Sequence, residues 1–203
     1  MGRRVERILG MVLLLVAFTV LMLTDPWPGR QRPQLGSGQV PSEALPLVDV
    51  GALGGVELVD RTEAALGRLA YPWQRELAGW ELAFLPGRPD LRGLTLPAAR
   101  RIEIYVRPAD DVGIIAHVVA HEIGHAVDLT FNDADDRGAW AEQRELPAAG
   151  WWPVEGVHDF DTGAGDWAEC FATWQTGSHS LSTVGGRCDA EDLALVARLS
   201  HDR

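Results

Sequence analysis

The stretch His121-Glu122-Ile123-Gly124-His125 determines how the rest of this sequence is interpreted. Residues four apart on an α-helix lie one turn from each other on the same face. The imidazoles of His121 and His125 can therefore bind a single cation, while Glu122 lies beside that cation without binding it. The spacing predicts a metal site on a helix.

The residues around this stretch are typical of a buried helix. Asp110 and Asp111 are candidate N-caps, and the chain is mostly apolar from there to Thr130. Two histidines and a carboxylate are costly inside a core unless they have partners, and a metal ion supplies one. The competing interpretation is an ordinary helix whose histidines make only hydrogen bonds. The apolar context favours the metal.

Zinc is the metal that this pattern indicates, and it would bring hydrolytic chemistry. Zinc lowers the pKa of a bound water to about 7. Glu122 could then take a proton from that water and pass it to a leaving amine. We therefore expect zinc-dependent hydrolysis of peptide bonds.

A catalytic zinc site usually takes three protein ligands, so a third ligand is expected downstream. A metzincin has Gly and His at the third and sixth positions after the second histidine, where this chain has Asp128 and Phe131. That class is excluded. Residues 165–174 form a second apolar segment with helical spacing, and it would place Asp166 and Glu169 on one face.

The two segments together resemble a known family. Residues 121–128 (His-Glu-Ile-Gly-His-Ala-Val-Asp) and 168–174 (Ala-Glu-Cys-Phe-Ala-Thr-Trp) resemble the catalytic domain of anthrax-lethal-factor-type gluzincin metallopeptidases. In that family the glutamate of the second segment is the third zinc ligand, which corresponds to Glu169. Asp166 remains the alternative ligand, or a partner that holds a ligand histidine.

The resemblance implies a zincin-like α+β fold. Such a fold has a small mixed sheet, an active-site helix that carries the His-Glu-x-x-His residues and a second helix that carries the third ligand. A strand just before the active-site helix usually lines the substrate cleft, where its exposed edge holds an extended peptide through main-chain hydrogen bonds.

Two features of that family have no counterpart in this chain. Thr173 replaces an acidic residue one turn after the ligand, and no tyrosine lies shortly before the ligand helix. Another donor would have to stabilise the oxyanion. His158 is the candidate, oriented by Asp159 or Asp161, and a loop histidine in solvent is the alternative.

Two more polar residues lie on the predicted active-site helix. His117 extends the four-residue spacing upstream, but it is about 12 Å from His125 along the axis, at about 1.5 Å per residue. It is too far to share one ion, and we predict a structural role. Asp128 follows His121 by about two turns on nearly the same face, so it is either a partner of a ligand histidine or simply a polar residue near the helix end.

Other elements of the domain follow from local patterns. Residues 61–77 read as an amphipathic helix that Pro72 would interrupt. Residues 80–85 and 101–106 alternate apolar with polar side chains, as half-buried strands do. Residues 189–199 read as a closing helix.

The N-terminal 24 residues indicate a membrane segment. Arginines precede an uncharged apolar run at residues 8–23, which favours an uncleaved signal anchor. A cleaved signal peptide, and hence a secreted protein, is the alternative. Residues 25–43 are rich in Pro and Gly and read as a linker, and residues 44–203 suffice for one domain. We expect a single-pass cell-membrane protein whose C-terminal domain is extracytoplasmic.

Cysteine content and charge bear on this location. An oxidising compartment would allow Cys170 and Cys188, the only cysteines, to pair. The formal net charge is −11, although the first 32 residues are net basic, so the C-terminal domain is strongly acidic. Such a domain argues against nucleic acid and against anionic lipid as partners.

The sequence therefore predicts a membrane-anchored, extracytoplasmic zinc metallopeptidase with a protein or peptide substrate. His121, His125 and Glu169 would hold zinc, Glu122 would activate water, and His158 would assist. The alternative is a non-catalytic envelope domain that keeps zinc for structure and binds a protein partner. An intracellular regulatory protease is disfavoured by the N-terminal segment. The oligomeric state is left open.

Overall fold

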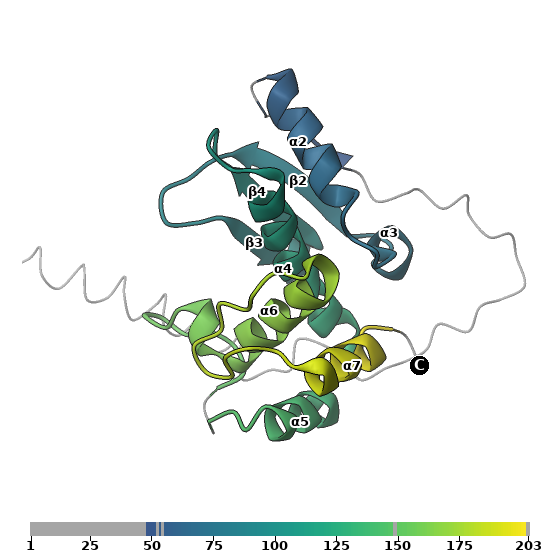
Figure 1. The fold of residues 1–203 in the computed structure, drawn as a ribbon, viewed down its shortest axis with the longest axis vertical. Helices are drawn as coiled ribbons and strands as arrows, with labels where there is room; N and C mark the ends of the chain where they lie inside the picture. Colours follow the sequence, from purple (N-terminus) through teal and green to yellow (C-terminus); the bar gives the residue numbers. More distant parts are fainter. Residues whose placement is uncertain (1–47, 52, 54, 148–149, 202–203) are drawn as a thin grey trace, which may run out of the picture. The chain divides into compact units, whose positions relative to one another are not determined.

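One small mixed sheet and several helices make up the described part of the chain, which comprises residues 48–51, 53, 55–147 and 150–201 of a computed structural model. Figure 1 shows their arrangement. This architecture confirms the predicted α+β class. The predicted signal anchor and linker lie outside the described residues.

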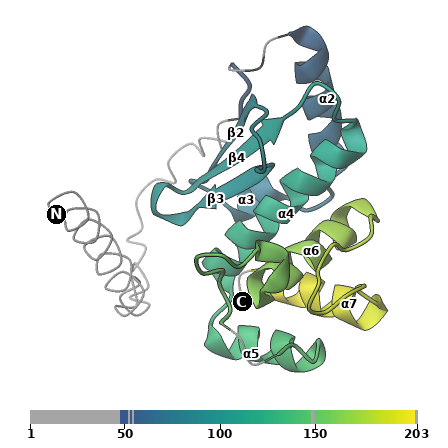
Figure 2. The same ribbon diagram turned by 90° about the vertical axis from the view of Figure 1, so that its left-hand side faces the viewer.

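The sheet has four strands in the order β1-β2-β4-β3. Figure 2 shows β2, β4 and β3 side by side. They are β1 (Val48–Asp49), β2 (Glu81–Pro86), β3 (Gly93–Leu96) and β4 (Arg101–Val106). The β1–β2 and β2–β4 pairs are parallel, and β3 pairs antiparallel with β4. The predicted strands at residues 80–85 and 101–106 are confirmed as β2 and β4.

The edge of the sheet differs from the expectation. The strand just before the active-site helix was expected to present a free edge, but β4 lies between two partners, with Ile104 opposite both Phe84 and Gly93. The edge strand next to β4 is β3, which was not predicted. It has only four residues, one of them Gly93, so it carries too little alternation to be recognised as a strand.

The helix predicted to carry the His-Glu-x-x-His residues is present as α4 (Val112–Phe131). Asp111 caps it, because its carboxylate accepts a hydrogen bond from the Ile114 amide at 2.8 Å. Most of the helix is buried, since it packs against α6 on one side and against β3 and β4 on the other (Figure 2). Among the described residues, α4 is the one helix long and apolar enough to cross a membrane, but 67% of its apolar window is buried inside the protein.

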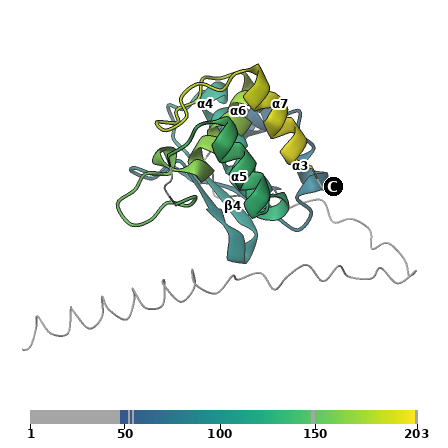
Figure 3. The same ribbon diagram turned by 90° about the horizontal axis from the view of Figure 1, so that it is seen from below.

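The described residues form five more α-helices around this core: α2 (Val56–Leu66), α3 (Trp73–Glu76), α5 (Ala134–Gln143), α6 (Gly163–Thr176) and α7 (Ala190–Leu199). The helical segment predicted at 61–77 is divided between α2 and α3, with Pro72 at the N-cap of α3. α6 and α7 match the predicted second and closing helices. α5 was not predicted, because its sequence is mostly polar and Trp140 is its only buried apolar residue. It packs against α6 and α7 (Figure 3).

α4 and α6 approach each other closely at Gly124. A Cβ atom there would lie 3.0 Å from both the Ala168 Cα and the Phe171 Cβ. The Trp167 indole donates a hydrogen bond to the Gly124 carbonyl at 2.9 Å. The expected disulfide between Cys170 and Cys188 is present, and it ties α6 to the segment that precedes α7.

Two glycine substitutions test this close approach. Gly124→Ala should lower the free energy of unfolding by about 1–3 kcal/mol, because the added methyl group overpacks the α4–α6 contact. Gly138→Ala is the matched control in α5, where a Cβ would meet nothing within 4 Å. It should raise that free energy by about 0.5–1 kcal/mol, since alanine favours a helix interior. Urea denaturation of both variants measures the difference, and a stabilising Gly124→Ala would contradict the packing.

Candidate metal centre

Three potential ligand atoms converge on one point. The Nε2 atoms of His121 and His125 are 3.1 Å apart, and Asp159 Oδ2 lies 3.0 Å from the first and 3.1 Å from the second. A tetrahedral zinc ion with bonds of roughly 2.0–2.1 Å would hold its ligand atoms about 3.3 Å apart. These three atoms, called the ligand cluster below, therefore have the spacing of three corners of such a site.

Two elements bring the ligand cluster together. His121 and His125 lie on successive turns of α4, with their ring centroids 4.8 Å apart. Asp159 opens the 3-10 turn η2 (Asp159–Asp161), directly before α6. The Thr162 hydroxyl donates to the Asp159 carbonyl at 2.7 Å and accepts from the Gly165 amide at 3.0 Å, which fixes this turn on the first turn of α6.

Sequence reasoning missed Asp159 as a ligand. The sequence predicts it only as a residue that orients His158. No local pattern marks it, because it is 34 residues from His125 and lies in an irregular segment. Its position depends on how α6 packs against α4.

The ligand cluster is buried at its histidines and open at its carboxylate. His121 and His125 are 7% and 8% exposed, whereas 31% of the Asp159 side chain is exposed. Burial alone would lower the pKa of His121, but hydrogen bonds to Asp159 and Glu169 outweigh it and raise this pKa to about 10. Burial opposes ionisation of Asp159, yet the two imidazoles hold its pKa well below its usual range. The carboxylates thus favour a positive charge at this place.

Glu122 is buried beside the ligand cluster and is held by β3. The Thr95 hydroxyl lies 2.7 Å from Glu122 Oε2. A Cβ atom at Gly93 would overlap the Glu122 carboxylate, so only glycine leaves room for it. The predicted catalytic carboxylate therefore lies between α4 and the edge strand.

Glu169 lies on the opposite side of His121 from the ligand cluster. Its Oε1 atom is 2.8 Å from His121 Nδ1 and 3.1 Å from His117 Nε2, and Oε2 accepts a hydrogen bond from the Leu181 amide. The structure thus does not bring Glu169 together with His121 Nε2 and His125 Nε2, as the resemblance implied. A carboxylate at Nδ1 accepts an N–H from that nitrogen, so Nε2 is the His121 atom available to a metal.

Asp166 is remote from the ligand cluster as well. It is fully buried and accepts hydrogen bonds from Arg144 at 3.0 and 3.1 Å, from the Trp140 indole at 3.1 Å and from the Ser182 hydroxyl at 2.6 Å. Arg144 also pairs with the buried Asp192 at 2.6 Å. The Asp166 carboxylate therefore links α5, α6 and the loop after α6. It does not take the alternative ligand role that the sequence left open.

His158 is exposed at the N-cap position of η2. Within the described residues its side chain makes no hydrogen bond. Neither expected orienting residue contacts it, because Asp159 belongs to the ligand cluster and the Asp161 carboxylate accepts from the Thr183 hydroxyl. His158 directly precedes Asp159 in the chain, and its ring has no hydrogen-bond partner among the described residues.

Asp128 acts on the ligand cluster only indirectly. Its buried carboxylate accepts hydrogen bonds from Arg137 Nε at 3.0 Å and from the Trp151 indole at 2.8 Å. The Arg137 guanidinium stacks 5.3 Å from the ring of Trp152, and that ring lies 6.4 Å from the ring of His125. This arrangement holds the loop before Asp159 against the end of α4. It differs from the direct contact with a ligand histidine that was considered for Asp128.

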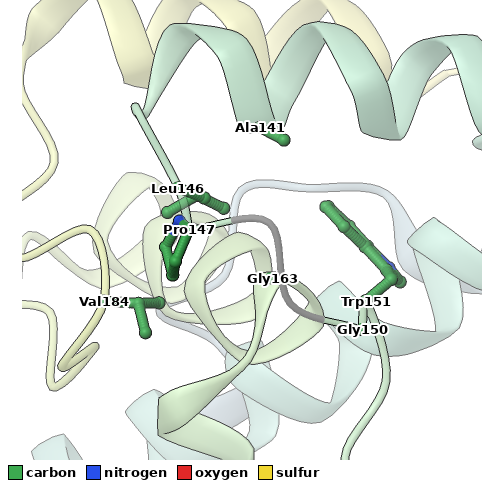
Figure 4. Close-up of a pocket in the computed structure, with 7 residues that line it drawn as sticks. All are labelled: Ala141, Leu146, Pro147, Gly150, Trp151, Gly163 and Val184. Carbon is green, nitrogen blue, oxygen red and sulfur yellow. The ribbon is translucent and has the colours of Figure 1, made fainter.

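A small cavity lies away from the ligand cluster (Figure 4). It has a volume of about 30 Å³ and is lined by Ala141, Leu146, Pro147, Gly150, Trp151, Gly163 and Val184. This is space for about one water molecule. It contains no residue of the ligand cluster, so it adds nothing to the metal centre.

No protein-family model matches the chain, and no curated protein or solved structure matches it either. Any functional assignment therefore rests on the residues and their geometry.

The role of Asp166 can be tested by Asp166→Asn. The change should lower the free energy of unfolding by about 3–5 kcal/mol, because it leaves the buried Arg144 charge without its main partner. Urea denaturation gives the value. Glu76→Gln is the matched control, since the Arg75 side chain of that ion pair is 70% exposed and such pairs contribute about 0–1 kcal/mol. Equal effects of the two changes would contradict the structural role of Asp166.

Proposed function

We propose that this protein is a zinc metallopeptidase whose metal ligands are His121, His125 and Asp159. The observation that carries the proposal is the convergence of their Nε2, Nε2 and Oδ2 atoms within 3.1 Å of one another. The proposal keeps the two histidines that the sequence indicated and replaces Glu169 with Asp159 as third ligand.

The donor chemistry of the ligand cluster fits zinc. Zinc takes imidazole nitrogen and carboxylate oxygen, and its catalytic sites keep three protein ligands and one open position. Two histidines and one carboxylate also suit non-haem Fe(II). The carboxylate of Glu122, next in the chain to a ligand histidine and buried beside the ligand cluster, favours hydrolysis over oxygen chemistry.

Zinc in this place would polarise a peptide carbonyl and lower the pKa of water. Glu122 would accept the proton of the attacking water and deliver it to the departing amine. The hydrogen bond from Thr95 would hold the Glu122 carboxylate in position for both transfers. His158, exposed and adjacent to Asp159, is the proposed donor to the oxyanion.

The edge strand supports a peptide as substrate. β3 has one partner, β4, and its other edge is unpaired within the described residues. An extended peptide that paired with this edge would run alongside Gly93 and Thr95, both of which contact Glu122. We propose a zincin-like arrangement on this basis, with β3 in the place expected for β4.

The proposed location is extracytoplasmic. The Cys170–Cys188 disulfide supports an oxidising compartment, and the N-terminal sequence supports attachment to the cell membrane as a single-pass protein. The acidic composition of the domain supports a protein or peptide partner over nucleic acid.

Glu122→Gln tests the proposed chemistry. The full-length protein, loaded with zinc, is incubated with a mixture of denatured proteins, and new amino termini are identified by mass spectrometry. Wild type should generate new termini, and Glu122→Gln should generate none while it retains one zinc per chain, because the amide cannot accept the proton. Removal of zinc with a chelator should abolish cleavage by wild type.

Arg75→Gln serves as the control, since this exposed residue lies in α3 and forms an ion pair with Glu76. It should cleave as wild type does. Cleavage by Glu122→Gln at the wild-type rate would refute the role of Glu122. A zinc-loaded wild type that produces no new termini would favour the non-catalytic envelope domain.

A further inference from the structure

Three hydrogen-bond donors converge on the buried carboxylate of Glu169. They are the His121 ring, the His117 ring and the Leu181 amide. Glu169 is fully buried, and both of its oxygens are used. His117 therefore does more than fill space in α4, because it shares one carboxylate oxygen with a proposed metal ligand.

The proton positions follow from the carboxylate. Both oxygens of Glu169 lie at hydrogen-bond distance from a ring nitrogen or a backbone amide. A carboxylate oxygen accepts hydrogen bonds, so the His117 and His121 nitrogens that face it are the donors. The other nitrogen of the His117 ring, Nδ1, lies 2.6 Å from the Ser178 hydroxyl oxygen.

The chain of contacts runs from the loop after α6 to the ligand cluster. Ser178 is hydrogen-bonded to His117, His117 is hydrogen-bonded to Glu169, and Glu169 is hydrogen-bonded to Nδ1 of His121. When a metal binds, the last contact would keep the remaining ring proton of His121 on Nδ1 and leave Nε2 as the ligand atom. Histidine ligands whose second nitrogen is held by a carboxylate bind metal more tightly, and loss of the outer partner typically weakens binding by about 10- to 100-fold.

We propose that His117 is a positioning residue for the metal, which acts through Glu169 on the ligand His121. The inference rests on the proposed metal site and adds a residue that touches neither the metal nor the substrate. His117 lies one turn before His121 on α4, so both rings reach the same oxygen of Glu169. Without the His117 donor, the carboxylate would lose one of its three hydrogen bonds and the constraint on its rotation.

The test measures zinc affinity of the full-length protein by competition with a chelator. His117→Leu removes the donor to Glu169, and its zinc dissociation constant should rise by up to about 10-fold, the lower end of the loss expected when the direct partner of a ligand histidine is removed. His117→Gln retains an N–H donor near the position of Nε2 and should restore most of the affinity. His201→Leu is the matched control, because His201 also lies near a carboxylate, Glu76 at 3.9 Å, but outside this region. It should bind zinc as wild type does.

Thermal unfolding of the metal-free variants separates positioning from folding. A positioning role predicts that His117→Leu and His117→Gln unfold at similar temperatures while their zinc affinities differ. Wild-type zinc affinity in His117→Leu would overturn the role of His117 and leave the proposed metal site intact. Equal loss of affinity in both variants, with equally lowered stability, would overturn it in favour of packing. Absence of zinc in the wild type would overturn the proposed metal site and this inference together.

Discussion

The packing of α4 against α6 is the constraint on which the rest of the site depends. Contact at Gly124 lets the two helices approach closely, and the Trp167 indole fixes their register by its hydrogen bond to the Gly124 carbonyl. One consequence is that Glu169, on α6, lies at the Nδ1 atom of His121. The other is that the turn before α6 places Asp159 at the Nε2 atoms of both histidines. A single helix pair thus supplies the ligand cluster and the carboxylate that orients it.

Local sequence patterns predicted the helices and strands whose own residues show a clear hydrophobic period or cap. α4 has a long apolar sequence and an aspartate cap, and β2 and β4 alternate clearly, so their bounds agreed with the expectation to within about a residue. β3 and α5 were missed for opposite reasons. β3 is too short to show a period, and α5 is held by the Asp133 capping box and one buried apolar residue, Trp140.

The site was predictable only where its residues share one helix. The four-residue spacing places His121 and His125 together in any α-helix, and Glu122 follows from the same periodicity. The sequence correctly predicted that Glu169 lies near His121. Which nitrogen of the His121 ring Glu169 faces depends on the register in which α6 packs against α4, and no local pattern encodes that register. The orienting role inferred for Glu169 and the ligand role proposed for Asp159 both depend on that register.

The most direct test of this account is the zinc content, by elemental analysis, of the wild type, Asp159→Ala and Glu169→Gln. The account predicts one zinc per chain in the wild type, none in Asp159→Ala, and one zinc at saturating metal in Glu169→Gln, because the ligand cluster of that variant is intact. Zinc retained by Asp159→Ala and lost from Glu169→Gln would contradict the account and make Glu169 the third ligand.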